Sequence, residues 1–191
     1  NSKKNIYKFN NDIIKVFSLG TNYGFSKALN FGISKSSYKY ILSVNPDVTV
    51  SEGSIFNILS YFKDNKDIGV VGPKVLNSDL TYQHSCRRRF PYLKYVFIKL
   101  LLLDKIGFRS NYNYSDIPND ITSTVDSISG CFFLTSKDVI KKIGLFDENF
   151  FIYFEDTDFC LRAKEKGYNV IYYPEASVIH KKFGSRNLKN Y

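Results

Sequence analysis

The segment YKYILSVNPDVTVSEGSIFNILSYFKDNKDIGVVGPKV, residues 38–75, decides the fold. Its apolar run at 38–44 is typical of a buried strand, which ends at the turn Asn45-Pro46-Asp47. A helix is expected next, with Ser51 as its N-cap and apolar side chains repeating along one face. A second apolar run at 68–75 predicts another strand. This order of strand, helix and strand indicates an α/β layered sheet.

The same alternation continues on both sides of this segment. Before it, residues 13–19 predict a strand and residues 26–34 a helix. After it, the sequence predicts a strand at 125–135, a helix capped by Ser136 and ending near Gly144, a helix at 159–167, and strands at 169–173 and 178–180. We therefore expect one mixed, mostly parallel sheet flanked by helices. Ligands bind such sheets outside the carboxyl ends of the strands.

A second segment, NFFIYFEDTDFCLR at 149–162, places three acids directly after a run of aromatic residues. Apolar surroundings raise the pKa of a carboxyl group, which suits a proton acceptor in a water-poor cleft. Glu155, Asp156 and Asp158 would also stand at the start of a helix, where the macrodipole favours negative charge. Asp158 can pair with Arg162 one turn later. Two interpretations stay open: an acid–base site, or an acidic helix cap beside an aromatic patch.

Further candidates follow from position. Asp47 stands at the carboxyl end of a predicted strand, where a carboxylate can bind Mg²⁺ or Mn²⁺ or simply cap the turn. The run Arg87-Arg88-Arg89 is expected to be extended, so its side chains point alternately to opposite sides and could reach phosphates or only solvent. Gly130, within a predicted strand, permits the close approach of a ligand or another backbone. His180 precedes a basic, glycine-containing tail that could cover a phosphate, or it is a structural histidine.

Composition narrows the kinds of partner and the cellular compartment that the protein could have. A net charge of +9 over 191 residues implies an anionic partner, either nucleic acid, a membrane surface or a phosphate-bearing substrate. The scattered basic residues form no nucleic-acid recognition motif, so no nucleic-acid partner is expected. The three cysteines form no CxxC pair, which favours a reducing compartment. The apolar stretch 93–108 is too short to span a bilayer and predicts a packed amphipathic helix or a peripheral membrane contact.

These pieces, in this order, resemble the family 2 glycosyltransferases with the GT-A fold. The branch they resemble most is the rhamnosyltransferase-like one, which builds bacterial surface polysaccharides. The resemblance covers nearly the whole chain and depends on the ordered set of motifs NYGF (22–25), VNPDV (44–48), GVVGPK (69–74), RRFP (88–91), SGC (129–131), IGLFDE (143–148) and FFIYFEDTD (150–158), with Arg162, Pro174 and His180.

The resemblance implies a role for each candidate. Asp47, in the place of the family's DxD motif, and His180 would bind the metal ion, Mg²⁺ or Mn²⁺. Asp156 would be the catalytic base, with Glu155 as the second candidate. The nucleotide-sugar would contact Asn22, Gly24, Asn45, Asp47, Arg88 and Arg89. Gly130 and Asp158 would lie on the acceptor side.

The resemblance implies an inverting, metal-dependent sugar transfer, with rhamnose as a candidate sugar. Transfer of one sugar is expected because the QxxRW motif of processive synthases is missing. The donor would be dTDP- or UDP-linked and the acceptor a saccharide or a lipid-linked saccharide. A base must accept the acceptor's proton and a cation must neutralise the leaving diphosphate, which the candidate residues can provide. A cytoplasmic location is implied, with contact at the inner face of the membrane left open.

The resemblance predicts one GT-A domain over residues 1–191, with the remaining donor and metal half at 1–80 and the acceptor and catalytic half at 81–191. Relative to the family pattern, the first βα unit and the second strand are missing, so an N-terminally truncated domain is expected. The alternative function is a catalytically inactive remnant that acts as a binding module.

Overall fold

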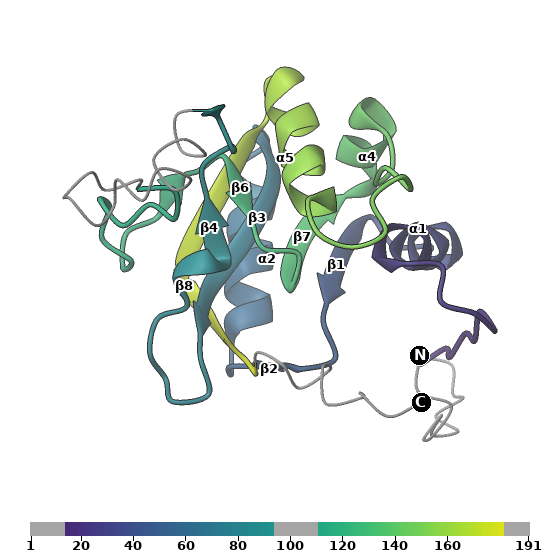
Figure 1. The fold of residues 1–191 in the computed structure, drawn as a ribbon, viewed down its shortest axis with the longest axis horizontal. Coiled ribbons are helices and arrows are strands. Elements are labelled where there is room, and N and C mark those ends of the chain that lie inside the picture. Colours follow the sequence, from purple (N-terminus) through teal and green to yellow (C-terminus); the bar gives the residue numbers. More distant parts are fainter. Residues whose placement is uncertain (1–13, 94–110, 182–191) are drawn as a thin grey trace.

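The computed structural model describes residues 14–93 and 111–181, and its centre is a six-stranded sheet with the order β1-β7-β3-β8-β2, in which β5 pairs with β8 (Figure 1). In chain order these strands are β1 (Tyr40–Val44), β2 (Val48–Val50), β3 (Ile68–Leu76), β5 (Ser123–Thr124), β7 (Phe132–Ser136) and β8 (Asn169–His180). A separate two-stranded sheet joins β4 (Arg87–Arg88) to β6 (Ser127–Ile128).

Strand direction determines where the functional residues meet. β3 and β8 pair in parallel from Ile68 beside Asn169 to Leu76 beside Ile179. β7 is antiparallel to β1 and β3, whereas β2 and β5 are antiparallel to β8. β1, β3 and β8 therefore point the same way, and their carboxyl ends share one edge with the amino end of β7. The predicted mixed sheet flanked by helices is confirmed, with its parallel pairing in the long central strands.

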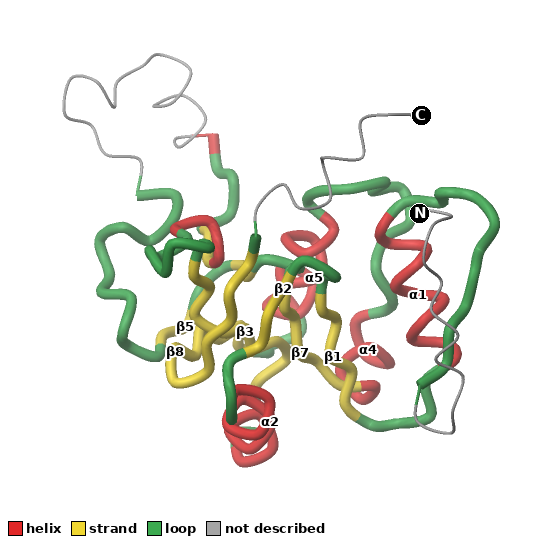
Figure 2. The backbone as a smooth tube through the Cα atoms, turned by 90° about the horizontal axis from the view of Figure 1, so that it is seen from below, coloured by secondary structure: helices red, strands yellow, loops and turns green. Residues whose placement is uncertain are grey.

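Helices cover both faces of this sheet. α2 (Ser54–Asp64) lies on one side and α5 (Glu155–Glu165) on the other, as Figure 2 shows. α4 (Lys137–Ile143) packs against β7 and α5. α1 (Phe25–Lys35) is tied to the chain before α5, because the Asn30 side chain donates to the Phe146 carbonyl at 2.8 Å and accepts from the Phe146 amide at 3.1 Å.

Most of the predicted helix and strand segments are present. The predicted helix 26–34 corresponds to α1, and the strand 68–75 corresponds to β3, which runs through Pro73. Ser136 caps α4 as predicted, since its hydroxyl accepts from the Val139 amide at 3.2 Å. β8 is one continuous strand rather than two, and its register with β3 shifts after Pro73.

Three further expectations were wrong. The predicted strand 125–135 is divided: residues 127–128 form β6, residues 132–136 form β7, and Gly130 lies in a turn between them. Residues 14–19 of the predicted strand 13–19 are irregular and half-exposed, because no described strand lies beside them to complete a hydrogen-bonded pair. Ser51 is not the N-cap of α2; the cap is Gly53, whose left-handed backbone at φ 73° suits glycine, and the helix begins three residues after Ser51 at Ser54. The predictions for most of the segment 93–108 and for the tail after Lys181 lie outside the described residues.

In the part of the chain that the structure describes, no helix combines the length and apolar character that crossing a membrane requires. The core lies between the sheet and its helices, and it is rich in aromatic contacts. Phe159 of α5 stacks on Phe146 at a centroid distance of 4.4 Å and meets Phe133 of β7 edge-on at 5.4 Å. These contacts fix α5, and with it the acids of its first turn, against the sheet.

Candidate active site

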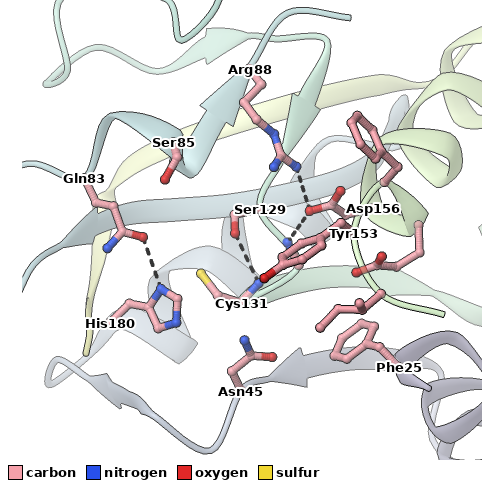
Figure 3. Close-up of a pocket in the computed structure, with 14 residues that line it drawn as sticks. Phe25, Asn45, Gln83, Ser85, Arg88, Ser129, Cys131, Tyr153, Asp156 and His180 are labelled. Atoms are coloured by element: carbon pink, nitrogen blue, oxygen red, sulfur yellow. Dashed lines mark hydrogen bonds and ion pairs between the residues drawn. The ribbon is translucent and has the colours of Figure 1, made fainter. Parts of the chain in front are cut away.

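A cavity of about 240 Å³ opens at the edge of the sheet where β1, β3 and β8 end (Figure 3). The predicted site residues that line it are Asn45, Arg88, Gly130, Glu155, Asp156 and His180. They come from five separate parts of the sequence, and the strand directions bring them to one place. The cavity is therefore the candidate active site.

Asp156 is the most firmly held group in the cavity. Its Oδ2 accepts hydrogen bonds from Arg88 Nη2 at 2.6 Å and from the Gly130 amide at 2.8 Å. Its Oδ1 accepts from the Thr157 hydroxyl at 3.2 Å. Burial acts to lower the pKa of Arg88, but the charge of Asp156 and its hydrogen bond to Arg88 together outweigh burial and the pKa is raised, so the guanidinium stays charged. The carboxylate is thus fixed in direction at the start of α5.

Glu155 lies beside Asp156 with less support. Its side chain is buried, and Oε2 has no hydrogen-bond partner among the described residues. Burial, and then the neighbouring Asp156 charge, raise the pKa of Glu155 above its ordinary value. A buried carboxylate oxygen without a donor is costly, so this atom is suited to a partner that arrives with a ligand.

We predict that Glu155→Gln stabilises the protein at pH 7 by about 1 kcal/mol, because the buried charge is removed. Since the folded-state pKa of Glu155 is raised, the wild type loses stability as pH rises from the ordinary value of 4.5 through the folded-state value. The gain of the variant should therefore vanish below about pH 4.5. Urea unfolding at pH 7 and pH 4 measures it.

The matched control is Glu165→Gln, at the exposed end of the same helix, which should change stability by less than about 0.5 kcal/mol at either pH. A Glu155→Gln variant that is less stable than wild type at pH 7, or equally shifted at both pH values, contradicts the prediction.

His180 lines the cavity, and Asp47, which is not among the lining residues, lies against His180. Asp47 follows β1, His180 ends β8, and Asp47 Oδ1 lies 3.3 Å from His180 Nε2. A carboxylate oxygen and an imidazole nitrogen are a suitable donor set for Mn²⁺ or Mg²⁺. Among the described residues no group of three or more His, Cys, Asp or Glu side chains could hold a metal. The two side chains could therefore supply two of the ligands of such an ion.

The three arginines alternate as predicted. Arg88 points into the cavity, whereas Arg87 is buried and donates to the carbonyls of Ile117 and Pro118 at 2.6 and 3.0 Å. Arg89 forms a two-bonded ion pair with Asp116 at 2.9 and 2.8 Å. Arg89 therefore does not line the cavity.

The other predicted residues lie outside the cavity lining. Asn22 Oδ1 accepts from the Gly24 amide at 3.0 Å and forms the turn before α1. Gly24, at φ 89°, lies so close to Phe151 that a Cβ atom would stand 2.6 Å from the Phe151 carbonyl oxygen. Asp158 pairs with Arg162 at 2.7 Å, as predicted.

The chain before α5 carries exposed aromatic side chains and an unusual backbone. Phe151, Tyr153 and Phe154 are half-exposed, and Tyr153 and Phe154 line the cavity. These last two adopt φ of 68° and 69°, a left-handed conformation that costs non-glycine residues about 1 kcal/mol or more each. Figure 3 shows the Tyr153 ring over the cavity beside Asp156. Strain of this kind is typical of sites that bind ligands.

Several lining residues could not be singled out from the sequence. They are Phe25, Gln83, Ser85, Ser129, Cys131 and Ile152. Burial raises the pKa of the Cys131 thiol to about 11, so the thiol stays protonated at neutral pH and is not a nucleophile. Gln83 contacts His180 Nδ1 through its Oε1 at 3.1 Å. No motif marks such a glutamine.

A mixed α/β sheet with acids and a histidine at the carboxyl ends of its strands is an architecture in which enzymes bind ligands at that edge of the sheet. The chain belongs to glycosyltransferase family 2. The model of Glycosyl transferase family 2 matches residues 1–144, and that of Glycosyl transferase family group 2 matches residues 107–190.

Curated relatives are similar along nearly the whole chain. The dTDP-rhamnosyl transferase RfbF of Shigella flexneri is 27% identical over 183 residues, which cover 93% of this chain and 56% of that protein. The rhamnosyltransferase WbbL of Escherichia coli K12 is 26% identical over 170 residues, covering 84% and 62%. The poly-beta-1,6-N-acetyl-D-glucosamine synthase of Staphylococcus epidermidis is 26% identical, covering 92% and 39%. The chain thus spans about half the length of these relatives.

Among solved structures, the crystal structure of GalNAc-T7 with UDP, GalNAc and Mn²⁺ superposes with a TM-score of 0.63 at 14% sequence identity. The superposition covers 87% of this chain and 32% of that one. At this identity it shows a common fold. The expected glycosyltransferase fold is thereby confirmed.

Proposed function

We propose that this chain carries out metal-dependent transfer of one sugar from a nucleotide-diphosphate sugar to a hydroxyl group, with inversion at the anomeric carbon. One observation carries the proposal: Asp156 and His180 line a single cavity of about 240 Å³, and Asp47 Oδ1 lies 3.3 Å from His180 Nε2. A proton acceptor on one side and a cation site on the other are what direct displacement at the anomeric carbon requires.

In this proposal the acceptor hydroxyl approaches Asp156 Oδ1, because Oδ2 is already held by Arg88 and Gly130. Asp156 takes the proton as the oxygen attacks the anomeric carbon, and the bond to the diphosphate breaks on the opposite face. A bound Mg²⁺ or Mn²⁺ would offset the negative charge of the departing diphosphate. Asp47 and His180 would hold that ion, and the diphosphate would supply further oxygen ligands.

The remaining assignments follow from position. The segment 151–154, whose backbone is strained at Tyr153 and Phe154, offers aromatic ring faces beside Asp156. Such faces suit the apolar faces of an acceptor sugar. Gly130 and Asp158 would lie on that acceptor side, and the 1–80 and 81–191 halves would divide donor and acceptor binding. Asn22 and Gly24 form the turn before α1, and Gly24 lies against Phe151. With Asn45, they would act on the nucleotide side.

The donor we propose is dTDP- or UDP-linked, with rhamnose favoured by the similarity to two rhamnosyltransferases. The acceptor would be a saccharide or lipid-linked saccharide of a bacterial surface polysaccharide. Buried, free cysteines and a net charge of +9 support a reducing, cytoplasmic setting and contact with an anionic inner membrane surface.

Isothermal titration with dTDP-rhamnose and with UDP-sugars, in Mn²⁺ and in EDTA, tests the proposal. We expect binding of one donor class, tighter in Mn²⁺, followed by donor turnover whose product has the opposite anomeric configuration by NMR. Donor binding without turnover, or no binding of either class, would favour the alternative function, an inactive domain that only associates with a partner.

A further inference from the structure

A series of side-chain hydrogen bonds leads from the surface to His180. At its outer end, Asp79 determines which group donates and which accepts. Asp79 Oδ1 accepts from the Thr81 hydroxyl at 2.6 Å and from the Thr81 amide at 3.0 Å. These two donors lower the pKa of Asp79. An ionised carboxylate only accepts hydrogen bonds, so the Thr81 hydroxyl must point its proton at Asp79.

The direction of the Thr81 hydroxyl fixes which group donates and which accepts in each of the next hydrogen bonds toward His180. Because the Thr81 proton is used, Thr81 Oγ1 accepts from Asn77 Nδ2 at 2.9 Å. Asn77 Oδ1 then accepts from Gln83 Nε2 at 3.0 Å. The amide of Gln83 is thus oriented, and its Oε1 faces His180 Nδ1 at 3.1 Å (Figure 3).

The backbone holds this chain of contacts rigidly. The Asn77 amide donates to the Thr81 carbonyl at 2.8 Å, and the Gln83 amide donates to the Val75 carbonyl at 2.9 Å, so residues 77–83 form a closed loop after β3. Gln83 is 2% exposed. Its side chain therefore cannot turn its acceptor oxygen away from His180 without leaving buried polar atoms unpaired.

The consequence lies on the other side of the imidazole ring. Since Gln83 Oε1 is an acceptor, His180 Nδ1 carries the ring proton of the neutral imidazole, and Nε2 presents a lone pair. That lone pair faces Asp47 Oδ1 at 3.3 Å. Two acceptors at this distance repel each other unless a cation or a proton lies between them, so the pair is suited to hold either a metal ion or a proton.

We propose that Gln83 is a positioning residue of the metal site: together with Asn77 it fixes the tautomer of His180 so that Nε2, not Nδ1, is the metal ligand. This inference rests on the proposed function, because it assigns a role toward the metal ion that function requires. Mutating the group that accepts a hydrogen bond from the second ring nitrogen of a metal-bound histidine commonly lowers metal affinity 10- to 100-fold.

The first experiment needs no metal and no variant. The chain contains two histidines, so ¹⁵N-edited NMR of the ring nitrogens is readily assigned to His84 and His180. At a pH where the rings are neutral, we expect His180 to be the Nδ1–H tautomer. An Nε2–H tautomer, or a rapidly exchanging mixture, would overturn the proposal.

The second experiment compares Gln83→Met with Gln83→Glu. Methionine has a similar size and no acceptor at this position, whereas glutamate keeps an acceptor oxygen. Mn²⁺ is titrated in the presence of UDP or dTDP and followed by the broadening of the His180 ring signals. We expect Gln83→Met to bind Mn²⁺ about 10-fold more weakly and to lose the fixed tautomer, and Gln83→Glu to bind at least as tightly as wild type.

The outcomes separate this inference from the proposed function. If wild type binds no Mn²⁺, the metal site of the proposed function fails, and the role of Gln83 fails with it. If wild type binds Mn²⁺ and Gln83→Met binds it equally well, the metal site stands and Gln83 has no positioning role. The far-UV circular dichroism of each variant reports whether it is folded.

Discussion

Replacing Asp156 with asparagine should slow sugar transfer by about 10³-fold while donor affinity stays within about 2-fold of wild type. General-base catalysis contributes 10²- to 10⁴-fold, and the amide cannot accept a proton. The substitution keeps the shape of the side chain, and the amide oxygen can still accept from Arg88 and the Gly130 amide. The measurements are kcat from donor turnover and the donor Kd from calorimetry in Mn²⁺.

The control is Asp138→Asn, another acid in the first turn of a helix, which pairs with Lys39 on the surface. It should leave both quantities unchanged. Unaltered turnover in Asp156→Asn would remove Asp156 from the role of proton acceptor. If turnover were instead lost in Glu155→Gln, the base would be Glu155, whose raised pKa and unpartnered oxygen make it the competing candidate.

The fold could be predicted where a segment's own residues determine its structure. α1 has apolar side chains at helical spacing, β3 is a continuous apolar run, and Ser136 caps α4 through a bond within its own turn. Residues 14–19 have equally apolar sequence but no described neighbouring strand, so the same pattern gives no strand there. A strand depends on its partner, and a single segment does not reveal whether a partner exists.

The site was predictable for residues that belong to motifs and occupy strand ends. The meeting of Asn45, Asp156 and His180 follows from the common direction of β1 and β8 and the start of α5. Arg88 and Arg89 looked equivalent in sequence, and the structure distinguishes them by their partners, Asp156 and Asp116. Gln83 was not predictable, because its effect depends on hydrogen-bond polarity passed through Asn77, which no spacing encodes.

Replacing Asp47 with alanine should lower transfer by about 10²-fold or more and remove the Mn²⁺ dependence of donor binding. Metal ions contribute several kcal/mol of charge stabilisation, and about 3 kcal/mol corresponds to 100-fold. The turn itself should survive, since it is closed by backbone bonds from the Val48 amide to the Asn45 carbonyl and from the Lys181 amide to the Asp47 carbonyl, both 3.1 Å. Donor Kd in Mn²⁺ should rise to the value measured in EDTA.

Asp64→Ala, at an exposed acid that ends α2, removes the same charge near the start of β3 rather than at the carboxyl ends of the strands, and should retain the Mn²⁺ dependence. Comparing the Asp47→Ala and Asp64→Ala variants therefore separates the loss of a metal ligand from a general change in net charge. The effect of Asp47→Ala also differs in kind from that of Asp156→Asn, because it weakens donor binding as well as turnover. A variant lacking the Asp47 carboxylate that still bound donor more tightly in Mn²⁺ would place the ion elsewhere, and His180 would then have no metal to share.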